Sequence, residues 1–179
     1  MEAGERARVF FALWPDASVR HALGELAVDA RAECGGRATA SDKIHLTLVF
    51  IGDIARSRVA ALQACAAAVE AKPFELELSV LGYWRHNRIV WAGAKRCPAE
   101  LVALVAALSR KLAGLGIREE NRPYVPHVTL VRNARAAPKQ TRMTPLAWRA
   151  RELVLVESLS GAGTSRYDVI SRWPVAASV

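Results

Sequence analysis

The spacing of apolar and polar positions divides the first part of the chain into strands and amphipathic helices. Residues 7–15, ARVFFALWP, combine aromatic and β-branched residues and are typical of a strand. Asp16 is a residue type that caps helices, and the apolar residues after it recur at helical spacing as far as about residue 32. This pattern predicts a helix that ends before Gly35-Gly36. Residues 44–52, IHLTLVFIG, then predict a second strand.

The rest of the chain continues in the same way. An alanine-rich stretch from Ser57 to about Glu70 predicts a second helix, and Pro98 opens a third, which carries a leucine-rich stripe and ends near Gly114. Residues 74–84 alternate apolar and polar positions, the period of a half-buried antiparallel strand. Four further short apolar segments predict strands at residues 88–93, 127–131, 153–159 and 167–175, the last two separated by the glycine-rich turn Ser160-Gly161-Ala162-Gly163.

The order of these elements favours an α+β architecture. Hairpin partners follow strands, and the chain lacks both the strict βαβ alternation and the glycine fingerprint of a dinucleotide-binding fold. Each half supplies a helix, an apolar strand and neighbouring hairpin strands, so two similar lobes are expected. A length of 179 residues suits a single domain over residues 1–179.

Composition and charge exclude some classes of protein but do not identify the function. No uncharged apolar run approaches the ~18 residues of a membrane span, and the N-terminus lacks the apolar core of a secretory signal, so we expect no membrane association and a cytoplasmic location. Cys34, Cys65 and Cys97 are far apart and are expected to be free thiols. The net charge of +8 fits a polyanionic partner, but it fits solubility charge equally well.

The candidate chemistry lies in a repeated motif. Two of the four histidines are followed two positions later by a threonine, in His45-Leu46-Thr47-Leu48 and His127-Val128-Thr129-Leu130. The chain has only six threonines in 179 residues, so chance rarely produces two such pairs. Residues i and i+2 of a strand share a face, and each motif therefore presents an imidazole beside a hydroxyl.

The apolar residues of each motif are expected to face the core. In the first strand this buried face comprises Ile44, Leu46, Leu48 and Phe50. A pair of imidazoles suits in-line displacement at phosphorus, with one ring as base and the other as acid. The threonine hydroxyls can donate to the non-bridging oxygens of the phosphate.

The other histidines do not repeat this pattern. His21 lies in a predicted helix and His86 in a polar turn, and both are expected to be structural or surface residues. His45 and His127 lack further ligands at metal-binding spacing, so we expect neither a metal nor another cofactor.

At these motifs the sequence resembles the 2H phosphoesterase superfamily and, within it, the RNA 2',3'-cyclic phosphodiesterases, also called 2'-5' RNA ligases. The resemblance runs nearly end to end, although the stretch GGRATASDKIH is less similar than its neighbours. It includes the segments ARVFFALWPD, LGYWRHNRIVWAG, RPYVPHVTLVR and LVLVESLSGAGTSRYDVISRWPV.

The resemblance implies a bilobal 2H phosphoesterase fold, with two antiparallel sheets flanking a central cleft and helices on the outer faces. It implies hydrolysis of RNA 2',3'-cyclic phosphate ends to 2'-phosphomonoesters, with His45 as proton donor to O3' and His127 as the base that activates water. The second motif matches the longer family pattern His-x-Thr-x-x-Arg, so Arg132 is expected to clamp the phosphate, provided that a bulge or a strand end turns it inward.

Several alternatives remain open at this point. Phe11 is expected either to stack on a base or to belong to the core, and Glu157 and Asp168 are expected to be structural or surface groups. The same histidines also suit 2'-5' ligation, 2'-5' cleavage or hydrolysis of a small cyclic nucleotide. A non-catalytic RNA-binding module is a further possibility. The expected partner is RNA with a 2',3'-cyclic phosphate end, bound by a monomer.

Overall fold

The computed structural model describes residues 5–117, 123–161 and 164–175. The helices of this part of the chain lie at Ala17–Cys34 (α1), Val59–Ala67 (α2) and Ala99–Gly114 (α3). Strands β1 to β5 span Arg6–Leu13, Arg37–Ala38, Leu46–Ala55, Glu75–Trp84 and Ile89–Ala94. Strands β6 to β9 span His127–Arg132, Arg142–Arg149, Glu152–Gly161 and Thr164–Pro174.

All strand pairs are antiparallel, and they form one sheet in the order β7-β4-β5-β6-β3-β1-β8-β9, with β2 added beside β6. The sheet has two halves, because β3 and β6 at its centre are joined through the single residue pair Leu46–Val128. The α+β class is confirmed. The two expected sheets are thus two halves of one sheet.

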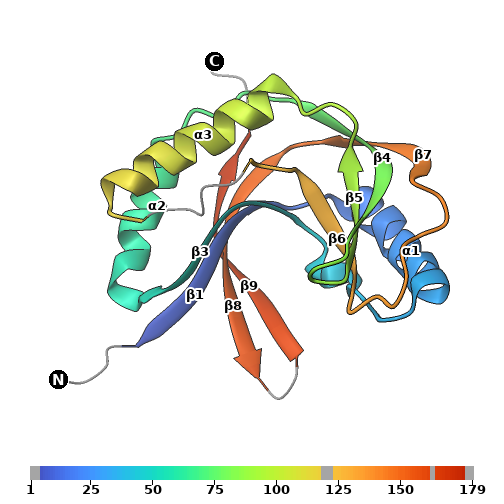
Figure 1. Ribbon diagram of the computed structural model, residues 1–179. Coiled ribbons are helices and arrows are strands. Elements are labelled where there is room, and N and C mark those ends of the chain that lie inside the picture. The colour runs from blue at the N-terminus through green and yellow to red at the C-terminus, as the bar shows by residue number, and fades with distance from the viewer. Residues whose placement is uncertain (1–4, 118–122, 162–163, 176–179) are drawn as a thin grey trace.

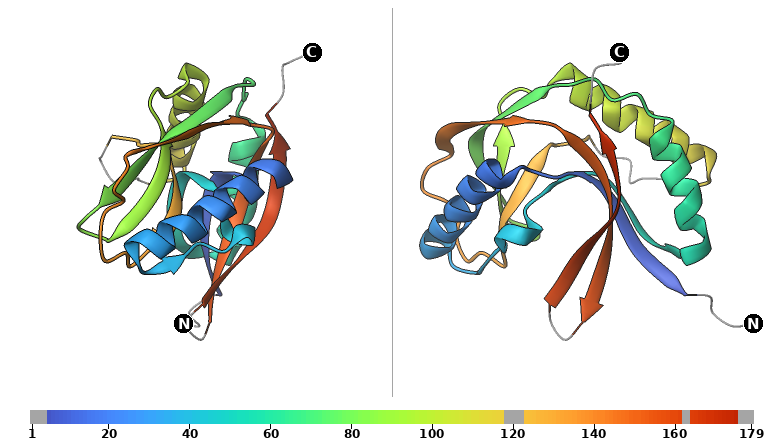
Figure 2. Two further views of the ribbon diagram at one scale, coloured as in Figure 1. Left: turned by 90° about the vertical axis from the view of Figure 1, so that its right-hand side faces the viewer. Right: turned by 180° about the vertical axis from the view of Figure 1, so that it is seen from behind.

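The helices cover the outer side of the arch that the sheet makes (Figure 1). Helix α1 packs against β2 and β6 in one half, whereas α2 and α3 pack against each other and against β9 and β3 of the other half. The right-hand view of Figure 2 shows α1 on the opposite side of the molecule from the α2–α3 pair. The concave side of the sheet is therefore left for the site.

The helices follow the sequence pattern closely. The Asp16 carboxylate accepts from the Val19 amide and caps α1, as its position predicts. The expected apolar stripe of α3 is buried. Helix α2 is shorter than its predicted 57–70 range at both ends, because its start is a 3₁₀ turn at Arg56–Arg58 and it already ends at Ala67. No helix in the described part of the chain is long and apolar enough to cross a membrane.

Two strands were missed by the pattern, β2 and β7. Strand β7 contains Pro145 and polar residues, and it is tolerated because it lies at the edge of the sheet, where a missing amide donor costs no ladder bond. Strand β2 has only two residues, which is too short for a period. Residues 162 and 163 of the predicted glycine-rich turn lie outside the described residues.

One buried face was predicted incorrectly. Ile44, Leu46 and Leu48 are buried, but Phe50 is 51% exposed. The register between β1 and β3 shifts at Leu48, where Phe11 pairs with Val49 and Ala12 pairs with Thr47. This bulge reverses the alternation, so Val49 enters the core and Phe50 leaves it.

Candidate active site

The two His-x-Thr motifs meet at the centre of the sheet. Leu46 pairs with Val128 in antiparallel register. Continued by one residue in each direction, this register sets His45 opposite Thr129 and Thr47 opposite His127. Leu46 and Val128 are fully buried, and the motif residues on either side of them alternate to the opposite face. The pairing brings both imidazoles and both hydroxyls to the concave side.

The backbone fixes the same tautomer in both rings. His45 Nδ1 lies 2.7 Å from the Lys43 carbonyl oxygen, and His127 Nδ1 lies 2.9 Å from the Val125 carbonyl oxygen. A carbonyl only accepts, so Nδ1 carries the proton and donates in each ring. In both rings Nε2 is therefore the nitrogen for proton transfer.

The imidazole of His45 is paired with its own motif hydroxyl. His45 Nε2 lies 3.1 Å from Thr47 Oγ1. When the ring is neutral, its Nε2 accepts from the Thr47 hydroxyl, and when it is protonated the direction reverses. The prediction that each motif places its two side chains side by side is confirmed for the first motif.

Aromatic rings enclose His45. Trp14 stacks on the imidazole at 5.7 Å with an interplanar angle of 12°, and Tyr167 meets it edge-on at 5.3 Å. Phe10 lies 4.9 Å away on a third side. These contacts fix the plane of the ring and remove much of its water.

The second histidine also has an aromatic neighbour. Trp84, at the end of β4, meets the His127 ring edge-on at 4.5 Å and itself packs on Trp91 of β5. Gly82 and Gly93 flank Trp91, and a Cβ at either glycine would overlap the indole ring. Close packing in this half of the sheet thus fixes Trp84 beside His127.

Arg132 faces the same space as the histidines. A cavity of about 260 Å³ is lined by Arg37, Ala38, Thr39, Ala40, Lys43, His45, Thr129, Arg132 and Tyr167. The register between β5 and β6 shifts between the pairs Val90–Val131 and Trp91–Thr129, and both Leu130 and Val131 are buried. This irregularity changes the alternation and brings Arg132 to the side of Thr129, as the interpretation of the longer motif requires.

The basic lining extends to β2. Arg37 pairs directly with Arg132 across the β2–β6 ladder. Gly36 makes this close approach possible, because a Cβ there would lie 2.5 Å from the Arg132 carbonyl oxygen. Three cationic side chains, from Arg37, Lys43 and Arg132, therefore line one small cavity, an arrangement suited to an anion such as a phosphate.

Burial lowers the pKa of His45 to about 4. The nearby positive charges of Arg132 and His127 lower this pKa further, whereas the hydrogen bond to the Lys43 carbonyl opposes the shift. His45 is therefore neutral near pH 7 in the ligand-free protein. An anion in the cavity would shield the His45 ring from the positive charges of Arg132 and His127 and would thereby raise its pKa again.

The sequence matches a known protein family over most of its length. The model of the family described as the 2'-5' RNA ligase superfamily matches residues 14–162. The chain belongs to this superfamily. It is 32% identical to the RNA 2',3'-cyclic phosphodiesterase of Escherichia coli K12 over 172 residues, which cover 94% of this chain and 97% of that protein.

Solved structures of the superfamily agree with the fold. Apo E. coli LigT superposes with a TM-score of 0.86 at 30% identity and covers 97% of this chain and 99% of its own. E. coli LigT in complex with 3'-AMP superposes with a TM-score of 0.83 at 32% identity, over 96% of this chain and 99% of its own. The expected 2H phosphoesterase fold is confirmed.

Phe11 does not line the cleft of this superfamily member. Its side chain is fully buried, and its ring packs 6.2 Å from Trp173. Stacking on a base needs an accessible ring face, so the base-stacking interpretation of Phe11 is wrong and the core interpretation holds. Strand alternation turns the neighbouring Phe10 toward His45 instead.

The two remaining histidines lie away from the motifs. His21 is highly exposed on α1, with its Nε2 3.6 Å from a Glu25 carboxylate oxygen, and His86 is exposed in the turn between β4 and β5. The three cysteines are free thiols, as expected. Within the described residues, no group of three or more histidine, cysteine or acidic side chains is arranged to hold a metal ion.

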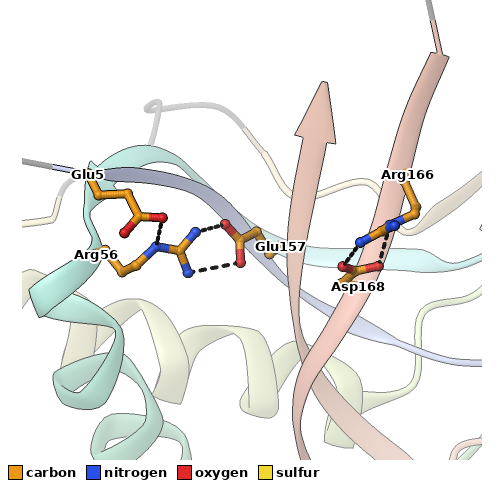
Figure 3. Close-up of polar contacts among 5 residues, drawn as sticks. All are labelled: Glu5, Arg56, Glu157, Arg166 and Asp168. Atoms are coloured by element: carbon orange, nitrogen blue, oxygen red, sulfur yellow. Dashed lines mark hydrogen bonds and ion pairs between the residues drawn. The ribbon is translucent and has the colours of Figure 1, made fainter. Parts of the chain in front are cut away.

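The sequence interpretation missed the partner of Glu157. This carboxylate is buried and forms a two-bond pair with the Arg56 guanidinium, which also contacts Glu5 (Figure 3). Asp168, opposite Glu157 in the β8–β9 ladder, pairs with the exposed Arg166. Arg56 and Glu157 are 101 positions apart, so no local pattern could have linked them.

Tyr124 is a further residue that the sequence did not single out. Its hydroxyl donates to the Thr47 carbonyl oxygen at 3.1 Å. The only signal was its position three residues before His127, which does not reveal a contact with the other motif. Trp14 and Tyr167 were missed in the same way, because their ring contacts with His45 depend on strand pairing.

Proposed function

We propose that the protein hydrolyses the 2',3'-cyclic phosphodiester end of RNA to a 2'-phosphomonoester by two-histidine acid–base catalysis. The observation that carries the proposal is the Leu46–Val128 pair, which brings two His-x-Thr motifs together across one sheet. The E. coli relative is named for this activity, and its structural counterpart has been crystallised with 3'-AMP.

In the proposed reaction, His127 takes a proton from a water molecule as that water attacks the phosphorus atom. The P–O3' bond breaks, and His45 Nε2 gives its proton to the departing O3'. Phosphorus stays on O2', which gives the 2'-phosphate. The assignment of acid and base follows the family resemblance, whereas the shared tautomer supports Nε2 as the reacting atom of both rings.

Three side chains would hold the phosphate. The hydroxyls of Thr47 and Thr129 are suited to donate to the non-bridging oxygens, where negative charge grows in the transition state. Arg132 would pair with the same oxygens and fix their orientation. Its position on the cavity that also contains His45 and Thr129 supports this role.

Substrate binding would also prepare His45 as an acid. A neutral His45 has no proton to give at Nε2, and the pKa of about 4 in the ligand-free protein keeps it neutral near pH 7. The phosphodiester anion would raise this pKa by placing a negative charge beside the ring and by pairing with Arg132. Protonation of His45 would therefore accompany substrate binding.

We further propose that residues 1–179 act as one domain of two lobes and that the protein works as a monomer in the cytoplasm on RNA. The site draws on both halves of the sheet, which supports a single functional unit. Cations at Arg37, Lys43 and Arg132 and the net charge of +8 support a polyanionic substrate.

A defined oligonucleotide with a 2',3'-cyclic phosphate end tests the proposal. Incubation with the purified protein should give a 2'-phosphate, resolved against authentic 2'- and 3'-phosphate standards. A 3'-phosphate product would contradict the proposed bond cleavage, and binding without any turnover would favour a non-catalytic RNA-binding module. A 2'-5' linked dinucleotide and a 3',5'-cyclic nucleotide should be assayed in parallel, because faster turnover of either would assign the site to that substrate.

A further inference from the structure

Phe50 is a large apolar side chain that the described reaction does not use. It lies within β3 and is 51% exposed. Single exposed apolar residues are common on protein surfaces, so its meaning depends on which face it occupies and on its neighbours.

The strand register places Phe50 on the face of the active site. Phe50 pairs directly with Phe10, just as Thr47 pairs with Ala12. Directly paired residues of antiparallel strands project from the same face. Phe10 contacts the His45 ring, and Phe50 therefore lies on the same face as the two motif side chains of β3.

Two register shifts produce this orientation. Leu48 and Ile51 are the extra residues of β3, one on each side of Phe50. The first shift turns Phe50 out of the core, and the second restores the alternation, so that Ile54 is buried again. The two shifts thus reverse which side chains face the core only in the segment around Phe50. The rest of the strand keeps its regular alternation.

A cation is held over the Phe50 ring. The guanidinium carbon of Arg8 lies 5.0 Å from the ring centroid, and Arg8 Nη1 lies 3.1 Å from an Asp53 carboxylate oxygen. Asp53 is the direct cross-strand partner of Arg8 and orients it. An exposed aromatic ring beside an oriented guanidinium is the combination with which proteins bind single-stranded RNA, by stacking on a base and pairing with a phosphate.

We propose that Phe50 and Arg8 form a second nucleotide subsite, in which Phe50 stacks on the base preceding the cyclic-phosphate nucleotide and Arg8 pairs with the adjoining phosphate. The subsite rests on the proposed function. A cyclic phosphate ends the RNA, so only the 5' side of the chain continues from the active site. Phe50 lies three residues beyond Thr47, roughly 10 Å at about 3.3 Å per residue, which is a suitable place for the preceding nucleotide.

The test compares a mononucleoside 2',3'-cyclic phosphate with a trinucleotide that ends in the same group. The measured quantity is the ratio of their KM values, trinucleotide over mononucleotide. Phe50→Leu keeps an apolar side chain but removes the aromatic face, and it should raise this ratio about 5- to 150-fold, the range typical of one stacked base. Phe50→Trp should keep the ratio near that of the wild type. Arg8→Ala should raise the ratio and weaken its dependence on salt.

Matched controls lie on the opposite side of the sheet. Val102 is 51% exposed on α3, and Arg110 is exposed on the same helix. Val102→Ala and Arg110→Ala should leave the ratio unchanged. An unchanged ratio in Phe50→Leu would overturn the subsite, and so would a shift from dimer to monomer in that variant by analytical ultracentrifugation, because the ring would then bind a second copy.

Failure of the proposed function gives a different result. If the wild-type protein hydrolyses neither substrate, binding of a fluorescent trinucleotide with a 2'-phosphate end still tests the subsite by anisotropy. A several-fold weaker affinity in Phe50→Leu, but not in Val102→Ala, would support it without any turnover. Equal affinities of the two variants would overturn it.

Discussion

The hydroxyl of Tyr124 donates to the carbonyl oxygen of Thr47 at 3.1 Å, and this bond ties the segment before the second motif to the first motif. Burial raises the pKa of Tyr124 well above its usual range, so the hydroxyl remains a donor at all working pH values. Because Thr47 belongs to β3 and Tyr124 leads into β6, the contact reinforces the junction that Leu46 and Val128 make. This hydrogen bond therefore helps to hold the two imidazoles in a fixed position relative to each other.

Tyr124→Phe should therefore lower kcat by about 5- to 100-fold with little change in KM, since misplacing reacting groups affects the chemical step more than ground-state binding. Tyr83→Phe is the matched control, because the Tyr83 hydroxyl also lies near a backbone carbonyl oxygen, at 3.5 Å, but that of Ala134, which belongs to neither His-x-Thr motif. Steady-state kinetics on a cyclic-ended oligonucleotide would measure both variants. A rise in KM alone would show that Tyr124 serves binding instead of positioning.

Replacement of either motif histidine should remove most of the activity. His45→Gln and His127→Gln should each lower kcat by ~10² to 10⁴, the usual loss when a general acid or base is removed. Circular dichroism and thermal unfolding would check that the fold is kept. His21→Gln and His86→Gln change exposed histidines outside the motifs and should retain wild-type rates. Full activity in a purified His45 or His127 variant would exclude the proposed mechanism.

The activity should survive chelation. The proposed chemistry assigns every proton transfer to the two imidazoles and every charge contact to Thr47, Thr129 and Arg132, so no step needs a metal ion. Prolonged treatment with EDTA followed by gel filtration should leave kcat unchanged, and added Mg²⁺, Mn²⁺ or Zn²⁺ should not raise it. Loss of activity on chelation with recovery on adding one of these ions would contradict this expectation.

Much of the fold followed from periodicity, because its elements bury one regular face. The leucine stripe of α3 and the alternation of Phe74, Leu76 and Leu78 in and just before β4 are buried as expected. The wrong or missed predictions concern segments in which the alternation of buried and exposed residues is interrupted or too short to detect. Phe50 was assigned to the core because a bulge cannot be recognised from alternation alone, and β2 is too short to have a period.

The site was predictable to the extent that its chemistry is local in sequence. His45 with Thr47 and His127 with Thr129 were recognisable because the same spacing occurs twice. Phe11 was left between base stacking and the core because adjacent residues of a strand face opposite sides, and the sequence does not say which side is the core. Tyr124 and Arg56 act through contacts with residues far away along the chain, which only strand pairing reveals.

The buried pair of Arg56 and Glu157 should contribute more to stability than the exposed pair of Arg166 and Asp168. Glu157 is only 6% exposed, so Arg56→Met would leave its carboxylate buried without its two-bond partner. Arg166→Met removes a similar contact at an exposed site, where ion pairs contribute little. Thermal unfolding should show a clearly lower Tm for Arg56→Met than for the wild type. The Tm of Arg166→Met should stay close to that of the wild type. Equal Tm values would show that the burial of Glu157 has no energetic consequence.

The pH dependence follows from the environment of His45. Its pKa is lowered to about 4 from the ordinary histidine value of 6.5 in the ligand-free protein, mainly by burial. Since kcat/KM reports the ionisations of the free enzyme, its acid limb should lie near pH 4, well below an ordinary histidine. The same profile should fall again on the alkaline side, because one imidazole must be protonated and the other neutral within a single turnover.

The profile of kcat should differ from that of kcat/KM, because kcat reports ionisations of the enzyme–substrate complex. The phosphodiester anion beside Arg132 should raise the pKa of His45, so the limb that belongs to His45 should lie at higher pH in kcat. NMR titration of the imidazoles with and without a 2'-phosphate product measures this shift directly, with His45→Gln to assign the signal. A His45 pKa that stays near 4 with the anion bound would mean that this ring is neutral in the complex near pH 7 and has no proton to give, and the roles of acid and base would then have to be exchanged between His45 and His127.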